Sequence, residues 1–311
     1  YLVVVFFIYR AILDPAVVAV EANNPAQAGN IGGLGLNSLL AWPVGALMAA
    51  AAAWVIGKIA LGLREDYLAI ATLGIAEIIV TVMRNEDWLA RGVKNLTGLP
   101  RPWPVPREVD LQLNPAFLEP VQAMGLDPVT ASTIFVKLLY ATMFGLVLVL
   151  LVWGCERALN SPWGRMVRAI RDNEISSAAM GKDVKFRHLQ IFIIGSAVVG
   201  LAGAMMTSME GQLTPPSYLP LRFTFLIWVM VIVGGSGNNW GSILGGLLIG
   251  WLYLAVEFLG PQMMDVITAG LPAGDLKDHL QDTAAQMRLL TLGVVLLLVL
   301  RFAPKGLIPE K

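Results

Sequence analysis

Apolar segments separated by shorter polar ones recur along the whole sequence. A helix that crosses the hydrocarbon of a bilayer needs about 20 largely apolar residues, because no water is present to satisfy free backbone groups. The pattern predicts an all-α fold, a polytopic transmembrane helical bundle of about seven or eight spans that occupies residues 1–311 as a single domain. The span 219–234 is short, and it is also compatible with a re-entrant or broken helix. The candidate spans are residues 1–9 (the end of a span), 39–60, 67–83, 132–155, 189–209, 219–234, 241–260 and 287–302.

The distribution of Lys and Arg predicts the side of the membrane on which each loop lies, because cationic loops stay in the cytoplasm. Residues 156–188 carry seven Lys or Arg against four Asp or Glu, whereas residues 84–131 carry five against six. We therefore expect 156–188 to be cytoplasmic and 84–131 to form an extracytoplasmic loop. This outer loop is rich in proline, so helix is expected there only in short pieces. It is interpreted as a docking surface or, alternatively, as a disordered connector.

Composition agrees with a membrane protein: 56% of the residues are hydrophobic and 14% are charged, and the mean hydropathy is +0.68. The net charge is zero, so no overall field favours nucleic acid as a partner. One cysteine, Cys155, and two distant histidines support neither a disulfide framework nor a metal site. We expect no catalytic residue and no cofactor bound by this chain. The chain starts at Tyr1 rather than Met, and we expect further spans upstream of it.

Two glycine-rich stretches, 29–35 and 234–241, superficially resemble phosphate-binding loops. Neither has the Lys followed by Ser or Thr that a Walker A motif requires, and neither has the preceding strand and following acidic residue of a dinucleotide site. Both are therefore predicted to be tight turns. If this chain takes part in ATP-driven transport, another chain must hydrolyse the ATP.

A few residues within the spans stand out from their apolar surroundings. Glu77 is the ionisable residue placed deepest in any span, and an unpaired carboxylate in hydrocarbon is costly. It is expected to meet a structural partner on a neighbouring helix or to line a translocation path, for which Thr72 is a second candidate. Trp42 is interpreted as an anchor at the membrane interface. Small residues at four-residue spacing predict close helix packing: Ser196, Gly200 and Ala204; Gly241 and Gly245; and Gly246 and Gly250.

The cationic segment is predicted to fold into two short helices with a kink between them. Ser161 can cap the first helix, and Pro162 suits its first position. Asn173 offers a second cap, and Gly181 is suited to end the second helix in the left-handed conformation.

Side chains along these two helices carry the candidate contacts. Arg165, Arg168 and Arg171 recur every three residues along one side, and Asp172 lies four residues after Arg168, a spacing that supports a pair. Apolar side chains of the segment must be buried on a lipid surface or in a groove of a partner protein: Met166, Val167, Ile170, Ile175, Ala179 and Met180.

The same stretch, RAIRDNEISSAAMGKDV, resembles the cytoplasmic coupling loop of ABC-importer permeases. Together with LREDYLAIATLGIAEII at 63–79, SAVVGLAGAMM at 196–206, VIVGGSGNNWGSILGG at 231–246 and the terminal RFAPKGLIPEK, it is similar to the LivM-type permease of branched-chain amino acid importers. On this resemblance the ATPase-coupling residues are Arg165, Arg168, Arg171, Asp172, Asn173, Glu174, Ala178, Ala179 and Gly181.

The resemblance implies a multi-pass permease of the bacterial inner membrane that works by alternating access. Its implied partners are a second, LivH-type permease, two cytoplasmic ABC ATPase subunits that bind ATP and Mg, a periplasmic substrate-binding protein, and membrane lipid. Three alternatives are a permease of a related urea or amide importer, an ion-coupled secondary transporter, and a membrane scaffold without transport. An ion-coupled transporter would show paired charges within its spans and an inverted internal repeat, and apart from Glu77 the sequence offers little of either.

Overall fold

The computed structural model describes residues 38–63, 65–85, 96–97, 99, 101–214, 220–269, 274 and 287–309. The helices in these ranges fall into two compact units, Tyr1–Ser217 and Tyr218–Lys311. The part-span expected at 1–9 and the glycine-rich stretch at 29–35 lie outside the described residues.

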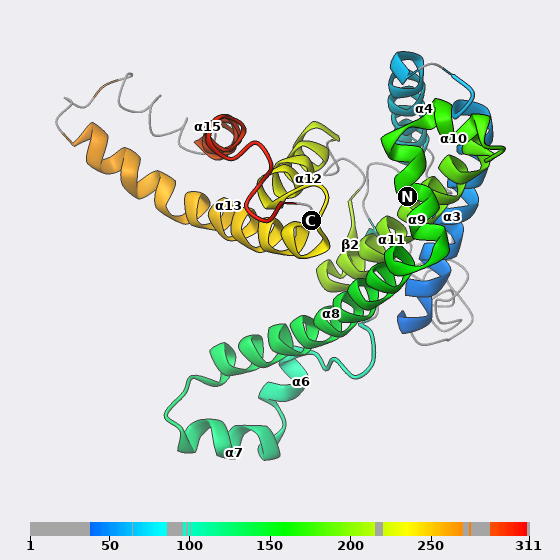
Figure 1. Cartoon of the computed structure of the whole chain (residues 1–311). Coiled ribbons are helices and arrows are strands. Elements are labelled where there is room, and N and C mark those ends of the chain that lie inside the picture. Colours follow the sequence, from blue (N-terminus) through cyan, green and yellow to red (C-terminus); the bar gives the residue numbers. More distant parts are fainter. Residues whose placement is uncertain are drawn as a thin grey trace. The chain divides into compact units, whose positions relative to one another are not determined.

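Helices account for nearly all of the regular structure (Figure 1), which confirms the all-α prediction. Among the described residues, five helices are long and apolar enough to cross a membrane, and each covers one predicted span: α3 (Ala41–Ala60), α4 (Glu65–Asn85), α8 (Pro128–Asn160), α11 (Val184–Glu210) and α13 (Asn239–Thr268). Two shorter apolar helices, α12 (Pro220–Gly234) and α15 (Met287–Phe302), match two further predicted spans. That α12 crosses the membrane fully stays a prediction.

The first unit is built on the antiparallel pair α3 and α11, which approach closely through small residues. A Cβ added to Gly200 of α11 would overlap Ala49 of α3, and one added to Gly57 of α3 would lie 2.6 Å from Leu189 Cδ1 of α11. Gly200 and Ala204 are buried and Ser196 is half-buried, so the predicted small-residue seam on α11 is confirmed. Such close approach maximises dispersion contacts where lipid offers no hydrophobic driving force.

Helix α8 is the longest element, and its 33 residues correspond to about 50 Å. Asp127 caps its start by accepting a 2.9 Å hydrogen bond from the Thr130 amide, and Pro128 occupies its first position. In its described residues, the proline-rich segment before it forms the short helices α6 (Glu108–Gln112) and α7 (Pro115–Ala123), as predicted. A two-residue antiparallel pair of β1 (Leu96–Thr97) with β2 (Gln212–Leu213) was not expected from the sequence.

The second unit packs α12 against α13 and α15 around four buried residues, Val229, Val233, Ile249 and Leu292. The stretch 234–241 forms the tight turn predicted for it: Gly235 has a φ of +118°, and Asn238 caps α13 by accepting from the Trp240 amide at 2.9 Å.

Residues that follow α15 return to this turn. The Leu307 amide donates to the Val233 carbonyl at 2.9 Å, and the Ile308 amide donates to the Gly234 carbonyl at 3.0 Å. Gly306 has a φ of +75°, and a Cβ on it would overlap Gly235. The tail thus supplies donors to the last carbonyls of α12, which have no partners within that helix.

The two glycine pairs predicted on α13 differ in their surroundings. Gly241 and Gly245 are buried against the end of α12, which confirms that seam. A Cβ on Gly246 or Gly250 would meet no atom of the described chain within 4 Å. Only the first pair therefore packs within this chain's described residues.

This difference yields a test of the α12–α13 packing. Gly245→Ala places a methyl group on the Met230 carbonyl, so we expect a loss of about 1–3 kcal/mol in stability. Gly246→Ala, the next residue along, enters open space and should leave stability unchanged. Thermal unfolding of the purified protein in detergent measures both variants, and equal melting temperatures would contradict the close approach.

Candidate functional site

The predicted cytoplasmic segment forms a compact two-helix element, α9 (Pro162–Asp172) and α10 (Glu174–Ala179), between α8 and α11. The Ser161 hydroxyl accepts from the Gly164 amide at 3.3 Å, and the Asn173 side chain accepts from the Ser176 amide at 2.9 Å. Gly181 follows α10 with a φ of +78°. Both predicted caps, the kink and the left-handed stop are confirmed.

Two of the three arginines on α9 bind the end of α8. Arg165 donates to the Asn160 carbonyl at 3.3 Å and Arg168 to the Leu159 carbonyl at 2.7 Å. These carbonyls lie at the C-terminal end of a helix, where cations are stabilised by the unsatisfied carbonyl dipoles. The predicted Arg168–Asp172 pair is wrong: Arg168 turns back to α8, and Asp172 pairs with its neighbour Arg171 at 3.1 Å.

Further contacts fix the element to α11 and hold its two helices together. Trp163 of α9 donates to the Gln190 side-chain oxygen at 3.2 Å, and Arg187 donates to the same oxygen at 2.8 Å. The buried Ser177 of α10 donates to the Ala169 carbonyl of α9 at 3.1 Å. The element is therefore bonded to both long helices that flank it.

The two helices differ in how much apolar surface they leave uncovered. On α9, Ile170 is 3% exposed, while Met166 and Val167 are half-buried. Around α10, Ile175 is 84% exposed and Met180 80% exposed. The sequence suggested that lipid or a partner protein must cover all six apolar residues. In the structure, only those around α10 still need such cover. The remaining residues of the predicted coupling set on this surface are also exposed: Glu174, Ala178, Ala179 and Gly181.

The two candidates for a translocation path lie on α4. The Thr72 hydroxyl donates to the Leu68 and Ala69 carbonyls of its own helix at 2.9 and 3.0 Å. Glu77 is exposed on this chain. Five positions separate the two residues, so they point about 140° apart on a helix. They do not share one face.

An apolar groove of about 460 Å³ lies between α3 and α11. It is lined by Ala49, Ala53 and Ile56 on α3 and by Phe192, Gly195 and Val199 on α11, with Ser196 the polar residue among its walls. Such a lining suits lipid chains or an apolar helix rather than a charged solute. In the described residues no group of three or more His, Cys, Asp or Glu is placed to hold a metal ion.

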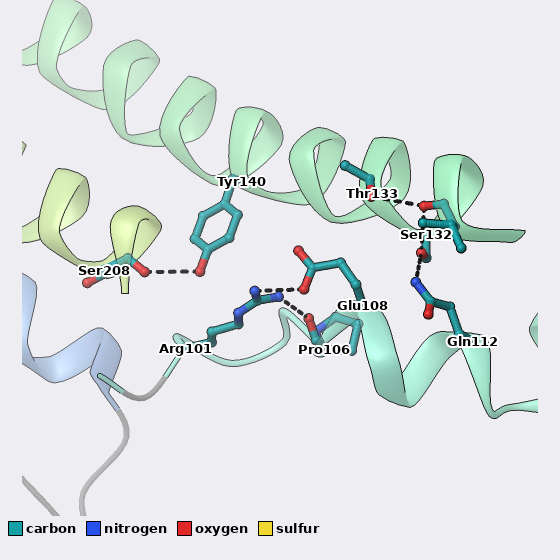
Figure 2. Close-up of polar contacts among 9 residues, drawn as sticks. Arg101, Pro106, Glu108, Gln112, Ser132, Thr133, Tyr140 and Ser208 are labelled. Carbon is teal, nitrogen blue, oxygen red and sulfur yellow. Dashed lines mark hydrogen bonds and ion pairs between the residues drawn. The ribbon is translucent and has the colours of Figure 1, made fainter. Parts of the chain in front are cut away.

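The segment predicted to be outside is bonded to α8 (Figure 2). Arg101 donates to the Pro106 carbonyl at 2.9 Å and pairs with Glu108 at 2.7 Å, and Gln112 donates to the Ser132 hydroxyl at 2.9 Å. Partial burial acts to raise the pKa of the Glu108 carboxyl, but the hydrogen bond and charge of Arg101 outweigh it and hold that pKa below its usual value of 4.5.

Three helices of the first unit meet through a junction of polar and aromatic side chains. The Tyr140 hydroxyl of α8 donates to the Ser208 carbonyl of α11 at 3.1 Å, as Figure 2 shows, and Trp42 of α3 donates to the Ser208 hydroxyl at 3.0 Å. The Phe144 ring lies 5.9 Å from that of Trp42 and 5.7 Å from that of Tyr140. From the sequence, Trp42 is interpreted as an anchor at the membrane interface, but it is 4% exposed and donates to Ser208 of α11, so it joins two helices instead.

Residues 16–300 match the family described as "Branched-chain amino acid transport system / permease component". The chain belongs to this permease family. The spanning helices and the match together make the permease a multi-pass membrane protein, and they confirm the resemblance on which the sequence interpretation rested.

The permease is similar to proteins named as high-affinity branched-chain amino acid transport system permease protein LivM. It is 30% identical to that of Escherichia coli K12 over 225 residues, which are 70% of this chain and 50% of the relative. It is 32% identical over 162 residues to the probable LivM of Methanocaldococcus jannaschii, covering 50% of this chain and 42% of that protein.

A shorter similarity links the permease to the ribose import permease protein RbsC of Haemophilus influenzae, 27% identical over 104 residues and 32% of each chain. The chain spans about half the length of the LivM proteins that it matches. No solved structure matches it.

Sequence reasoning missed the junction of Trp42, Tyr140 and Ser208 and the Arg101–Glu108 ion pair. Tyr140 and Ser208 lie 68 positions apart in the sequence, so no local spacing joins them. Arg101 and Glu108 are close in sequence, but Arg101 lies in an irregular segment and no regular helix spacing predicts their pair. Aromatic residues near span ends were a visible signal, but their partners depend on how the helices pack.

The Arg101–Glu108 pair predicts that the stability of residues 101–112, in the segment predicted to be outside, depends on pH. Because the pKa of Glu108 is lowered in the folded state, the pair contributes stability above about pH 4.5, and this contribution is lost as the pH falls through the lower folded pKa. Protease cleavage within residues 101–112 should therefore accelerate below that pH. The Glu108→Gln variant should be cleaved rapidly already at neutral pH. The Glu119→Gln variant, changed at an exposed site on α7, should be cleaved at the wild-type rate. If the cleavage rate of the wild-type protein did not change with pH, the stabilising role of the Arg101–Glu108 pair would be contradicted.

Proposed function

We propose that this chain is the permease subunit of an ATP-driven importer of branched-chain or related amino acids in a bacterial inner membrane. The observation that carries the proposal is the family match over residues 16–300. An element with an exposed surface, bonded to two spanning helices, is the feature that such a subunit needs to receive movement from another chain. A ligand or partner drives a conformational change only by binding one state better than the other.

The α10 surface supports a cytoplasmic ATPase as the partner on that side. Ile175 and Met180 present apolar side chains next to the exposed carboxylate of Glu174. Contacts of α9 with α8 and α11 would pass movement of a docked ATPase to both helices as rigid bodies. ATP and Mg would bind to two such ATPase subunits and not to this chain.

The remaining partners follow from the other surfaces. The outer segment is held on α8 and leaves Trp103 and Leu113 more than two-thirds exposed, which suits docking of a substrate-binding protein. Helix α4 buries few residues within this chain, so a second permease or lipid would cover it. Glu77 on that helix would then line the path between two permeases or pair across their interface.

Reconstitution tests the proposed function. The chain is placed in liposomes with a second permease of the family, two ABC ATPases and a substrate-binding protein. We expect uptake of labelled leucine, isoleucine or valine that requires ATP and persists when ion gradients are collapsed. Uptake of urea or amides alone would favour the related importer, and uptake abolished by an ionophore would favour an ion-coupled transporter.

Ile175→Ser should weaken binding of the ATPase to the permease. Burying an Ile side chain stabilises by ~1.5–3 kcal/mol, so the affinity should fall about tenfold or more. Val109→Ser is the matched control, since Val109 is an exposed aliphatic residue on α6 of the outer segment. Pull-down of the ATPase by each detergent-solubilised variant measures the effect, and equal recovery from both would refute the α10 surface.

Glu77→Gln should lower uptake while leaving protein yield and assembly intact if the carboxylate lines the path. Thr72→Ala, about 140° away on the same helix, should leave uptake near wild type because a narrow path meets one face of α4. Uptake per assembled complex measures both variants. A loss confined to the yield of Glu77→Gln would instead assign Glu77 a structural partner.

A further inference from the structure

The junction at Ser208 joins α3, α8 and α11, so its residues lie at the same height along the three helices. Trp42 lies at the first turn of α3, whose 20 residues match the thickness of the hydrocarbon. Counting about 20 residues back from Ser208 along α11 reaches Leu189, next to the polar stretch that begins that helix. The same count from Tyr140 along α8 ends near Asn160. On this count the junction lies at a boundary of the hydrocarbon on all three helices, and in the proposed orientation this boundary is the outer one.

This level divides α8 into a spanning part and a projecting part. Residues 128–139 extend beyond the junction, and at 1.5 Å per residue they project about 18 Å. The spanning part below Tyr140 runs about 30 Å to the end of the helix.

Residues 101–139, here called the outer arm, pack as one body around the projecting turns. Val105 is buried against Val136 and Tyr140, and the Phe117 ring lies 5.8 Å from that of Phe135. The Gln112–Ser132 hydrogen bond joins α6 to the first turns of α8.

The opposite end of the same helix carries the coupling element. Arg165 and Arg168 bind the Asn160 and Leu159 carbonyls at the end of α8, and a Cβ on Gly164 would overlap the Ala158 and Leu159 carbonyls. Helix α8 has its one proline at its first position, so its backbone is continuous between the two attachments. A continuous helix of this length moves as a rod.

We infer that α8 pivots at the Tyr140–Ser208–Trp42 junction, and that Tyr140 is the residue that positions the pivot. One hydrogen bond to a backbone carbonyl of α11 and one tilted ring contact, Phe144 with Trp42 of α3, locate α8 without interlocking the helix backbones. With arms of about 18 and 30 Å, a 3 Å displacement of the coupling end moves the tip of the outer arm by about 2 Å in the opposite direction. Docking outside and ATPase movement inside are thereby linked through one helix.

This inference rests on the proposed function, and the reconstituted complex described above tests it. Tyr140→Phe removes the hydrogen bond and keeps the ring beside Phe144. Stimulation of ATPase activity by the loaded binding protein should fall about 2- to 10-fold, while unstimulated hydrolysis and assembly stay at wild-type levels. Tyr67→Phe removes a hydroxyl from an exposed tyrosine of α4 and should change neither rate.

Ser208→Ala gives a second, sharper comparison. It removes the acceptor for Trp42 but leaves the backbone carbonyl that Tyr140 binds, so stimulation should remain above that of Tyr140→Phe. Equal loss in both variants, or no loss in Tyr140→Phe, overturns the pivot. Failure of the wild-type chain to assemble with ATPases overturns the proposed function instead, and the pivot falls with it.

Movement itself is measured by pulsed electron paramagnetic resonance distances to a spin label at Val199→Cys on α11. The native Cys155, exposed near the inner end of α8, is the first partner label. Leu113→Cys in the outer arm, in a Cys155→Ser background, is the second. In labelled chains that keep Tyr140, the 199–155 and 199–113 distances should both change on nucleotide binding. In the Tyr140→Phe background, only the 199–155 distance should change. An outer arm that stays fixed while Cys155 moves in the wild-type protein overturns the pivot.

Discussion

Close approach of helix backbones is the interaction on which both units of this permease depend. Lipid tails are as apolar as leucine side chains, so helices within a bilayer gain little from burying apolar surface and must gain from contact and hydrogen bonding. Gly200 against Ala49 in the first unit, and Gly245 against Met230 in the second, allow that contact. Most leucine and valine side chains on the outer faces of α8 and α13 remain exposed, as expected for surfaces that meet lipid or another subunit.

Helix ends impose the second constraint, because the last carbonyls of a helix lack partners within it. The chain meets this need differently at two places. Arginines of α9 turn back onto the end of α8, whereas amides of the tail reach the end of α12. At the first place, the arginine hydrogen bonds that satisfy the carbonyls also fix the direction of the two-helix element α9–α10 relative to α8. The sequence suggested that Arg165 and Arg168 contact a partner, but both bind carbonyls of this chain. The exposed apolar side chains that could meet a partner lie around α10 instead.

Local features of the structure could be predicted from the sequence, and contacts between distant segments could not. Apolar run length located the spans, and the residue types at Ser161, Asn173 and Gly181 located the caps and the stop, because each depends on neighbours a few residues away. The Tyr140–Ser208 bond and the burial of Trp42 depend on which helices meet and at what height. For Arg168, a tertiary acceptor in α8 displaced the local partner that helix spacing suggested.

The tail residues Leu307 and Ile308, which bond to the end of α12, are synthesised long after that helix. Synthesis of α12 and completion of its hydrogen bonds are therefore two separate events. Helix α12 is synthesised before α13 and α15, so the carbonyls of Val233 and Gly234 still lack their final donors when this helix is made. Water at the membrane surface can serve them in the interval. The protein replaces that water only after Leu307 and Ile308 have been synthesised. The hydrogen bonds at the end of α12 are therefore completed only when the C-terminal residues of the second unit are available.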